Sequence, residues 1–302
     1  MIRISSPGLI LAGVSLGSVA PAFIKGQYLL HMEDFAMKRI NALTIAGTDP
    51  SGGAGIQADL KVFSALGAYG TSVITALVAQ NTCGVQSVYN IDPAFVAAQL
   101  DSVFSDVRID SAKIGMLANA NVVERVAERL RHYRPVFVVL DTVMLAKSGD
   151  PLLAPEAVAS IRRELMPLVS LITPNLPEAA ALLACSPAEN EQQMRQQGRA
   201  LMAMGCQAVL MKGGHLNEEE SPDWLFTADR EQRFSAPRVA TSHTHGTGCT
   251  LSAALAALRP RHEDWATTVV AAKDYLQQAL QQADTLEVGR GIGPLHHFHA
   301  WW

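Results

Sequence analysis

The chain has 302 residues, of which 49% are hydrophobic and 17% charged, and its formal net charge is −4. This length and composition predict a large buried core, in one large α/β domain or two smaller ones, and argue against disorder. No block of Lys or Arg occurs, so neither a nucleic-acid partner nor a membrane surface is expected. The cysteines form no Cys-x-x-Cys pair, which argues against a zinc knuckle or a disulfide framework and favours a reducing, cytoplasmic location.

The first 36 residues differ in texture from the rest. Residues 8–23 are apolar and glycine-rich and have some features of a signal peptide, but Ser, Gly and Pro interrupt them. Met37 then opens "MKRINALTIAG", which resembles a natural start followed by a strand. We therefore expect residues 1–36 to be an extension, either disordered or a misassigned start, and residues 37–302 to form a single domain.

From residue 37 onward, short apolar strands alternate with amphipathic helices. The predicted strands are 40–47, 71–80, 112–117, 136–143, 171–175 and 208–214. The predicted helices are 56–66, 93–107, 120–133, 154–169, 176–184 and 189–204; a hairpin at 224–239 precedes a helix that opens after residue 246 and a long one at 266–283. Strands this uniformly apolar are covered on both faces, so we expect a three-layer α/β fold with a mainly parallel sheet.

In such a sheet, ligands bind beyond the carboxyl ends of the strands. The first of these ends opens the loop "TDPSGGAG", whose glycines do not have the Gly-x-Gly-x-x-Gly spacing. The second predicted strand ends at Gln80, where a dinucleotide site needs an acidic residue, so a nicotinamide oxidoreductase is disfavoured. The planar amide of Gln80 suits the edge of a heterocycle, although from this position alone an ordinary capping or loop amide is favoured.

The later strands also end in polar residues. Asp141 follows a fully apolar strand, where a carboxylate is costly to bury unless it binds a cation or polar ligand. Asn175 and Glu178 match a capping box, and their oxygens could also lie beside Asp141 around a hydrated Mg²⁺. Lys212 precedes two glycines and is suited to a phosphate, or is a plain solvated lysine.

The stretch "HGTGCTLSAALAALRP" places two glycines and a thiol at the start of a helix. Unpaired amides and the helix dipole make such a turn an anion site, lined here by Gly246, Thr247 and Gly248. At that position we expect the pKa of Cys249 to be lowered. The alternative is a simple turn with Cys249 as a small buried side chain. Together with the strand-end residues, these groups predict phosphoryl transfer, although no P-loop is present.

Five motifs in order resemble the ribokinase superfamily: "AGTDPSGGAGIQADLK", "VVLDTVM", "TPNLPEA", "MKGGH" and "GTGC". Within it, the chain from Met37 to the end is similar to the hydroxymethylpyrimidine and phosphomethylpyrimidine kinases of thiamine biosynthesis. The resemblance implies a ribokinase-like fold and ATP as phosphate donor, with Mg²⁺. It also implies two successive reactions, phosphorylation of 4-amino-5-hydroxymethyl-2-methylpyrimidine and then of its monophosphate.

The resemblance also implies roles for individual residues. Cys249 is the candidate catalytic base, and the amides of Gly246, Thr247 and Gly248 form the anion hole. Mg²⁺ and the nucleotide phosphates would be held by Asn175, Glu178, Asp141 and Lys212. The aminopyrimidine would be contacted by Gln80, Met116 and Val143, and less directly by Gly47 and Asp59.

Two other functions stay open at this point. A pyridoxal or pyridoxine kinase would use the same chemistry on another heterocycle, and a non-catalytic relative would only bind ligand. Members of the superfamily often pair, so a homodimer is expected by resemblance. The C-terminal "HHFHAWW" has no metal-binding spacing and is expected to be a packed or interface segment.

Overall fold

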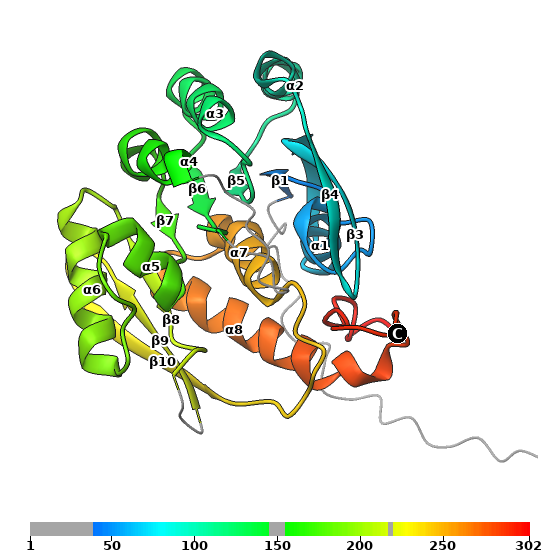
Figure 1. The fold of residues 1–302 in the computed structure, drawn as a ribbon, viewed down its shortest axis with the longest axis vertical. Helices are drawn as coiled ribbons and strands as arrows, with labels where there is room; N and C mark the ends of the chain where they lie inside the picture. The colour runs from blue at the N-terminus through cyan, green and yellow to red at the C-terminus, as the bar shows by residue number, and fades with distance from the viewer. Residues whose placement is uncertain (1–38, 145–154, 217–219) are drawn as a thin grey trace, which may run out of the picture. The chain divides into compact units, whose positions relative to one another are not determined.

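A computed structural model describes residues 39–144, 155–216 and 220–302. The expected extension at residues 1–36 lies outside these ranges. Within them, eight strands form one sheet in the order β10-β9-β8-β7-β6-β5-β1-β2 (Figure 1). Their bounds are β1 Ile40–Ala46, β2 Ala68–Ile74, β5 Ser111–Ile114, β6 Phe137–Leu140, β7 Leu171–Ile172, β8 Val209–Lys212, β9 Glu220–Phe226 and β10 Glu231–Pro237. Within this sheet, β2, β1, β5, β6, β7 and β8 are parallel to one another. β9 runs antiparallel to β8, and β10 runs antiparallel to β9, as the predicted hairpin requires.

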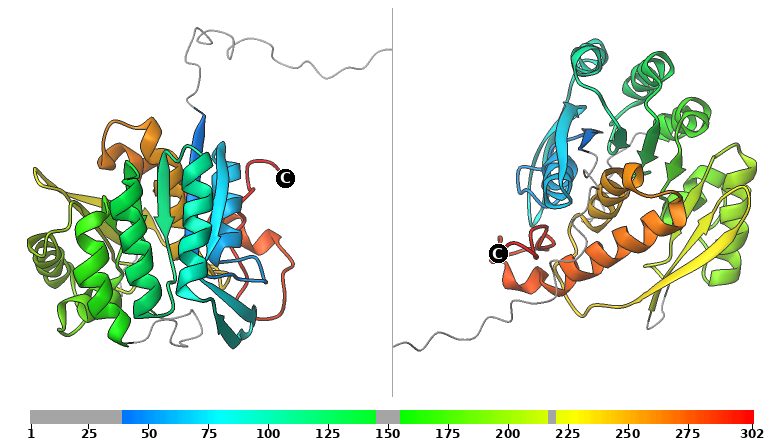
Figure 2. Two further views of the ribbon diagram at one scale, coloured as in Figure 1. Left: turned by 90° about the horizontal axis from the view of Figure 1, so that it is seen from above. Right: turned by 180° about the vertical axis from the view of Figure 1, so that it is seen from behind.

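Helices cover both faces of this sheet (Figures 1 and 2). One face carries α1 (Gly55–Ala65), α7 (Thr247–Leu258) and α8 (Trp265–Gln281). The other carries α2 (Pro93–Asp106), α3 (Ala120–Tyr133), α4 (Pro155–Ser160), α5 (Leu176–Leu183) and α6 (Glu191–Ala203). The expected three-layer α/β architecture with a mainly parallel sheet is confirmed.

The period of two along each strand divides the core between the two faces. In β6, Val138 and Leu140 pack with α3, whereas Val139 lies between them on the α7 face. The buried strand β5 follows the same alternation, so Lys113 lies among residues facing α1 and α7 although both its neighbours are apolar. A charged side chain is therefore built into the middle of the sheet, directly under the helix that carries Cys249.

The strand predicted at 71–80 is wrong, because the chain leaves the main sheet halfway along it. β2 ends at Ile74, and β3 (Ala76–Asn81) pairs with β4 (Gly84–Asn90) in a separate two-stranded sheet. The buried Thr75 marks the break: its N–H donates to Ala46, and its hydroxyl donates to the carbonyl of Met116. Apolar residues continue across the break, so the pattern alone does not show it.

The helix predicted at 154–169 is also not continuous. After α4 the chain forms a π-helical turn at Ile161–Leu165 and a 3₁₀ turn at Met166–Leu168. Pro167 lies in that second turn, where it cannot continue an α-helical hydrogen-bond ladder. In contrast, α3 has the predicted bounds, and its N-terminus is capped by Asn119, whose side chain accepts from the amide of Val122 at 3.1 Å. No helix in the described ranges is long and apolar enough to span a membrane.

Candidate active site at the carboxyl edge of the sheet

The turn before α7 depends on the absence of side chains. Gly246 is the N-cap residue and has φ of 82°, a left-handed conformation that favours glycine. A Cβ on Gly246 would lie 1.7 Å from the carbonyl oxygen of Gly53, in the glycine loop that precedes α1. The two loops therefore pack backbone against backbone. The backbone amides at the start of α7, which the sequence analysis expected to face a ligand, follow this turn.

Two charged residues lie against this turn. Lys212, at the end of β8, places its Nζ 3.2 Å from Oδ1 of Asp141, which follows β6. A Cβ on Gly248 would lie 3.5 Å from Lys212 Nζ and 3.6 Å from Oδ2 of Asp141. Asp141 also accepts hydrogen bonds from Ser252 in α7 (3.1 Å) and from Thr173 (3.3 Å). The structure thus brings together Lys212, Asp141 and Gly248 from three separate segments.

Electrostatics keeps this pair charged although it is buried. Burial opposes ionisation of Asp141, but Lys212 and Lys113 outweigh it and lower the pKa of Asp141. Burial likewise disfavours the charged form of Lys212, and the Asp141 and Glu178 carboxylates raise its pKa instead. A cation and an anion therefore stand beside the first turn of α7.

Asn175 and Glu178 form the predicted capping box at the start of α5. Asn175 accepts from the amide of Glu178, and Glu178 accepts from the amide of Asn175, both at 2.9 Å. Glu178 also accepts from the hydroxyl of Thr142 at 3.0 Å and lies 3.9 Å from Lys212 Nζ. Burial raises the pKa of Glu178. The structural reading of these two residues is confirmed, and they also adjoin the Lys212–Asp141 pair.

The expected lowering of the Cys249 pKa is wrong for this unliganded protein. Burial raises the pKa of the Cys249 thiol to about 11; Lys113 and the Gly55 amide lower it, but Asp59 and Asp141 add to the rise. Cys249 lies in the first turn of α7, next to the turn at Gly246 and Gly248. Desolvation and the two carboxylates outweigh Lys113 and the Gly55 amide there.

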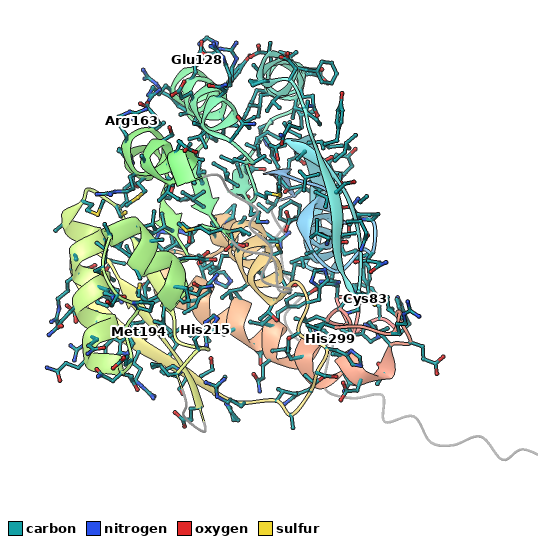
Figure 3. All side chains as sticks on the ribbon, viewed as in Figure 1. Cys83, Glu128, Arg163, Met194, His215 and His299 are labelled. Atoms are coloured by element: carbon teal, nitrogen blue, oxygen red, sulfur yellow. The ribbon has the colours of Figure 1, made fainter. Side chains whose placement is uncertain are left out.

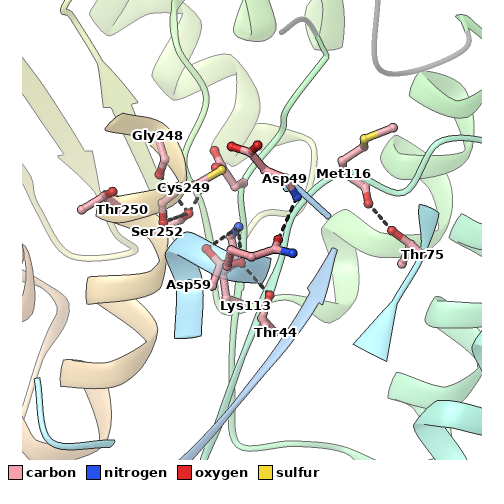
Figure 4. A network of polar contacts seen from close by, with 12 residues as sticks. Thr44, Asp49, Asp59, Thr75, Lys113, Met116, Gly248, Cys249, Thr250 and Ser252 are labelled. Carbon is pink, nitrogen blue, oxygen red and sulfur yellow. Dashed lines mark hydrogen bonds and ion pairs between the residues drawn. The ribbon is translucent and has the colours of Figure 1, made fainter. Parts of the chain in front are cut away.

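Asp59, expected as a less direct contact of the aminopyrimidine, lies in the core beside Lys113. It is fully buried on α1, and its carboxylate forms an ion pair with Lys113 at 2.9 and 3.0 Å. The hydroxyl of Thr44 donates to the same carboxylate at 2.6 Å. Figure 4 shows this group beneath Cys249 and Gly248. The carboxylate of Asp59 is thus engaged by Lys113 and Thr44, and its contact with the substrate stays a prediction.

The other predicted substrate residues gather at the ends of neighbouring strands. Gly47 follows β1, and Met116 follows β5, with its sulfur 3.1 Å from where a Cβ on Gly47 would stand. Val143 follows β6, and Gln80 lies near the end of β3. Because β1, β5 and β6 are adjacent in the sheet, Gly47, Met116 and Val143 share one edge with Asp141, whereas Gln80 belongs to the separate two-stranded sheet.

Asp49 and His245 were not among the predicted residues. Asp49 is 1% exposed, and its carboxylate accepts from the amide of Ala54 at 2.7 Å and lies 2.7 Å from Nε2 of His245. The signal was present in the quoted motifs, since both residues stand inside them. The spacing of residues in the sequence does not show which side chains form hydrogen bonds between two distant loops.

The C-terminal segment packs in part against α7 and the turn after β3, whereas Trp301 and Trp302 at its end are exposed. His297 is buried, with Nε2 3.0 Å from the hydroxyl of Thr250 in α7. The amides of Gly291 and Ile292 donate to Thr82, in the turn after β3. Figure 3 shows Cys83, in the same turn, beside this C-terminal segment. No cluster of three or more His, Cys, Asp or Glu side chains able to hold a metal occurs in the described ranges.

Comparison with known proteins identifies the family of the chain. Residues 49–296 match the family model described as phosphomethylpyrimidine kinase. The hydroxymethylpyrimidine/phosphomethylpyrimidine kinase of Escherichia coli K12 is 77% identical over 266 residues, which are 88% of this chain and all of that protein.

Solved structures of similar fold include two bacterial kinases. Phosphomethylpyrimidine kinase from Clostridium difficile is 39% identical, with a TM-score of 0.72 over 80% of this chain and 100% of its own. The ADP complex of Bacillus subtilis pyridoxal kinase is 33% identical, with a TM-score of 0.80 over 87% of this chain and 98% of its own. The assignment made from the motifs is confirmed: the chain belongs to the phosphomethylpyrimidine kinase family.

Proposed function

We propose that the site transfers the γ-phosphoryl group of ATP to the hydroxymethyl group of 4-amino-5-hydroxymethyl-2-methylpyrimidine, and then a second group to the monophosphate, as a step of thiamine biosynthesis. The observation that carries this is the Lys212–Asp141 pair against Gly248 at the start of α7. A cation beside unpaired helix amides is suited to the charge that develops on a migrating phosphoryl group. The nucleotide-bound relative supports ATP as the donor.

We assign a role in this reaction to the residues around the start of α7. The amides of Gly246, Thr247 and Gly248 bind the transferred group, and Lys212 binds the phosphates of the nucleotide. The alcohol oxygen forms the new P–O bond as the bond to ADP breaks, and Cys249 receives the alcohol proton. Because a protonated thiol cannot accept a proton, Cys249 must ionise once the ligands are bound. Lys113, whose charge lowers the thiol's pKa, favours that ionisation.

Mg²⁺ fits this site as a hydrated ion held largely by phosphate. When bound, it would neutralise charge on the nucleotide phosphates. Asp141 and Glu178 are already engaged by Lys212 and Thr142, and Asn175 by the capping box. We therefore expect Asp141, Asn175 and Glu178 to hold the ion partly through water rather than to enclose it.

The small sheet also supports the expected homodimer. Leu77 and Tyr89 are cross-strand partners in β3 and β4, and they are 46% and 70% exposed. Tyr69, on β2 at the edge of the main sheet, is also 70% exposed. An apolar face of this kind is typical of a protein contact, and light scattering of the wild type and Tyr89→Glu would test it.

Product analysis tests the proposed function directly. Purified protein with ATP and Mg²⁺ is offered the aminopyrimidine alcohol or pyridoxal, and products are identified by mass spectrometry. We expect the monophosphate and then the diphosphate of the pyrimidine. Turnover of pyridoxal alone, without the second phosphorylation of the pyrimidine, would support the pyridoxal kinase alternative instead.

A further inference from the structure

His245, directly before the turn that forms the anion hole, joins segments that are far apart in the sequence. Its Nε2 lies 2.7 Å from Oδ2 of Asp49, which stands 196 residues away in the glycine loop after β1. Its backbone amide donates to the carbonyl of Gly293 in the C-terminal segment at 3.0 Å. The side chain of His245 is only 15% exposed. Both the backbone and the side chain of His245 are therefore held in place.

The partner of the His245 ring, Asp49, is a fixed and ionised acceptor. Its Oδ1 accepts from the amide and the hydroxyl of Ser51, at 2.9 and 2.6 Å, and its Oδ2 accepts from the amides of Gly53 and Ala54, at 3.2 and 2.7 Å. Burial alone would raise the pKa of Asp49, but hydrogen bonds from His245 and Ser51 hold it well below its usual range. Because an ionised carboxylate can only accept hydrogen bonds, His245 donates its Nε2–H to Asp49.

This hydrogen bond lies where the two loops touch. A Cβ on Gly53 would lie 2.5 Å from Cδ2 of His245, and a Cβ on Gly246 would lie 1.7 Å from the carbonyl oxygen of Gly53. Asp49 holds the amide of Gly53, and His245 is the residue before Gly246, so their hydrogen bond sets how closely the two backbones approach. Gly246 is the N-cap of α7. A change in this spacing moves Gly246 and, with it, the unpaired amides that follow.

We propose that His245 is a positioning residue for phosphoryl transfer, whose hydrogen bond to Asp49 holds the amides of residues 246–248 in the orientation that receives the migrating phosphoryl group. His245 acts through the turn and not by contact with the reacting atoms. The inference rests on the proposed function, since it concerns the same anion hole. Because these amides act most strongly on the transition state, loss of the hydrogen bond lowers kcat more than it raises the KM for ATP.

The first test compares two substitutions of His245. His245→Leu removes the donor, whereas His245→Gln keeps an N–H at about the distance of Nε2 from the backbone. We expect His245→Leu to lower kcat about tenfold or more and to change the KM for ATP less than about twofold, and His245→Gln to recover most of the lost kcat. Rates are expressed per folded molecule, counted by the stoichiometry of ADP binding. If His245→Leu does not fold, His245→Asn replaces it, because its amide nitrogen lies nearer the backbone than Nε2 does.

A second test measures the anion hole without turnover. Aluminium fluoride bound with ADP imitates the migrating phosphoryl group, so its affinity reports on the groups that bind the transition state. Calorimetry with Mg²⁺ and the pyrimidine alcohol compares ADP alone with ADP and aluminium fluoride. We expect His245→Leu to weaken the aluminium fluoride complex about tenfold or more, while the affinity for ADP alone stays within about twofold of the wild type. A loss of stability alone would not separate these two affinities.

His262→Leu is the control. His262 is also a half-buried histidine, but it follows the 3₁₀ turn Arg259–Arg261, beyond the opposite end of α7. This variant should keep the wild-type kcat and both affinities. If folded His245→Leu keeps them too, or if His245→Gln recovers none of the loss, the proposal is wrong. If the wild type neither phosphorylates the pyrimidine nor binds ADP more tightly with aluminium fluoride, the proposed function fails instead.

Discussion

Lys212, which is half-buried, and the buried Asp141 form an ion pair 3.2 Å long, although 71 residues separate them in the sequence. They meet because β6 and β8 flank β7 and end at the same edge of the sheet. The ion pair also adjoins Glu178, so one cation faces two carboxylates. Lys212 is therefore the residue on which the charge balance of the site depends.

Lys212→Met should lower kcat/KM about 100-fold or more, because it removes positive charge from the phosphates and leaves two buried carboxylates unpaired. Steady-state kinetics with ATP and the pyrimidine measures this. Arg199→Met is the control, since Arg199 forms an ion pair with Glu231 and neither residue contacts Lys212 or Asp141. The control should keep most of its kcat. Equal kcat losses in both variants would count against a direct role for Lys212.

Cys249→Ala should nearly abolish turnover while nucleotide affinity, measured by calorimetry, changes little. In the wild type the thiol must ionise for the reaction, so kcat should rise with pH above neutrality. The low residual rate of Cys249→Ala should lack that rise. A variant with near-full rate would remove the proton-acceptor role.

Alkylation offers an independent measure of the Cys249 thiol. With its pKa raised to about 11, little thiolate exists at neutral pH in the unliganded protein. Modification by iodoacetamide, followed by peptide mass spectrometry, should be slow near neutrality and rise about tenfold per pH unit below that pKa. Fast modification at neutral pH would show that the helix dipole outweighs burial after all.

Asp59→Asn should destabilise the protein by about 3–5 kcal/mol, because it leaves the Lys113 ammonium buried without a counter-charge. The double variant Asp59→Leu/Lys113→Met removes both charges and should recover much of that loss. Urea unfolding gives both values. If the single and double variants were equally unstable, packing rather than charge would explain the effect.

His297 should make stability depend on pH. Burial, with smaller contributions from Lys61, His296 and His245, lowers the pKa of His297 from 6.5 to about 3. The unfolded chain therefore takes up the proton first as pH falls. Stability from the neutral ring is complete above the unfolded pKa and is lost at up to about 1.4 kcal/mol per pH unit below it. Urea unfolding of His297→Gln across this range should show a shallower slope than the wild type.

The residues that the sequence identified best are those at strand ends. Asp141, Lys212 and Gly248 follow or face apolar strands, and a parallel sheet brings such positions together whatever their separation in the chain. The ion pair of Asp59 with Lys113 was not predicted, because the direction of a helix side chain depends on how the helix is packed. Lys113 was overlooked inside an apolar run. The predicted direction of the Cys249 pKa shift was wrong, because a sequence motif does not show how strongly its residues are desolvated.

The backbone contact between Gly246 and the carbonyl of Gly53 limits how this enzyme can be re-engineered. A larger side chain at this contact would push the two loops apart. Libraries that randomise the turn at Gly246 would therefore consist largely of inactive clones. Met116 and Val143, the proposed contacts of the aminopyrimidine, follow β5 and β6 and carry side chains whose size can be varied. Attempts to broaden the range of accepted rings should begin there.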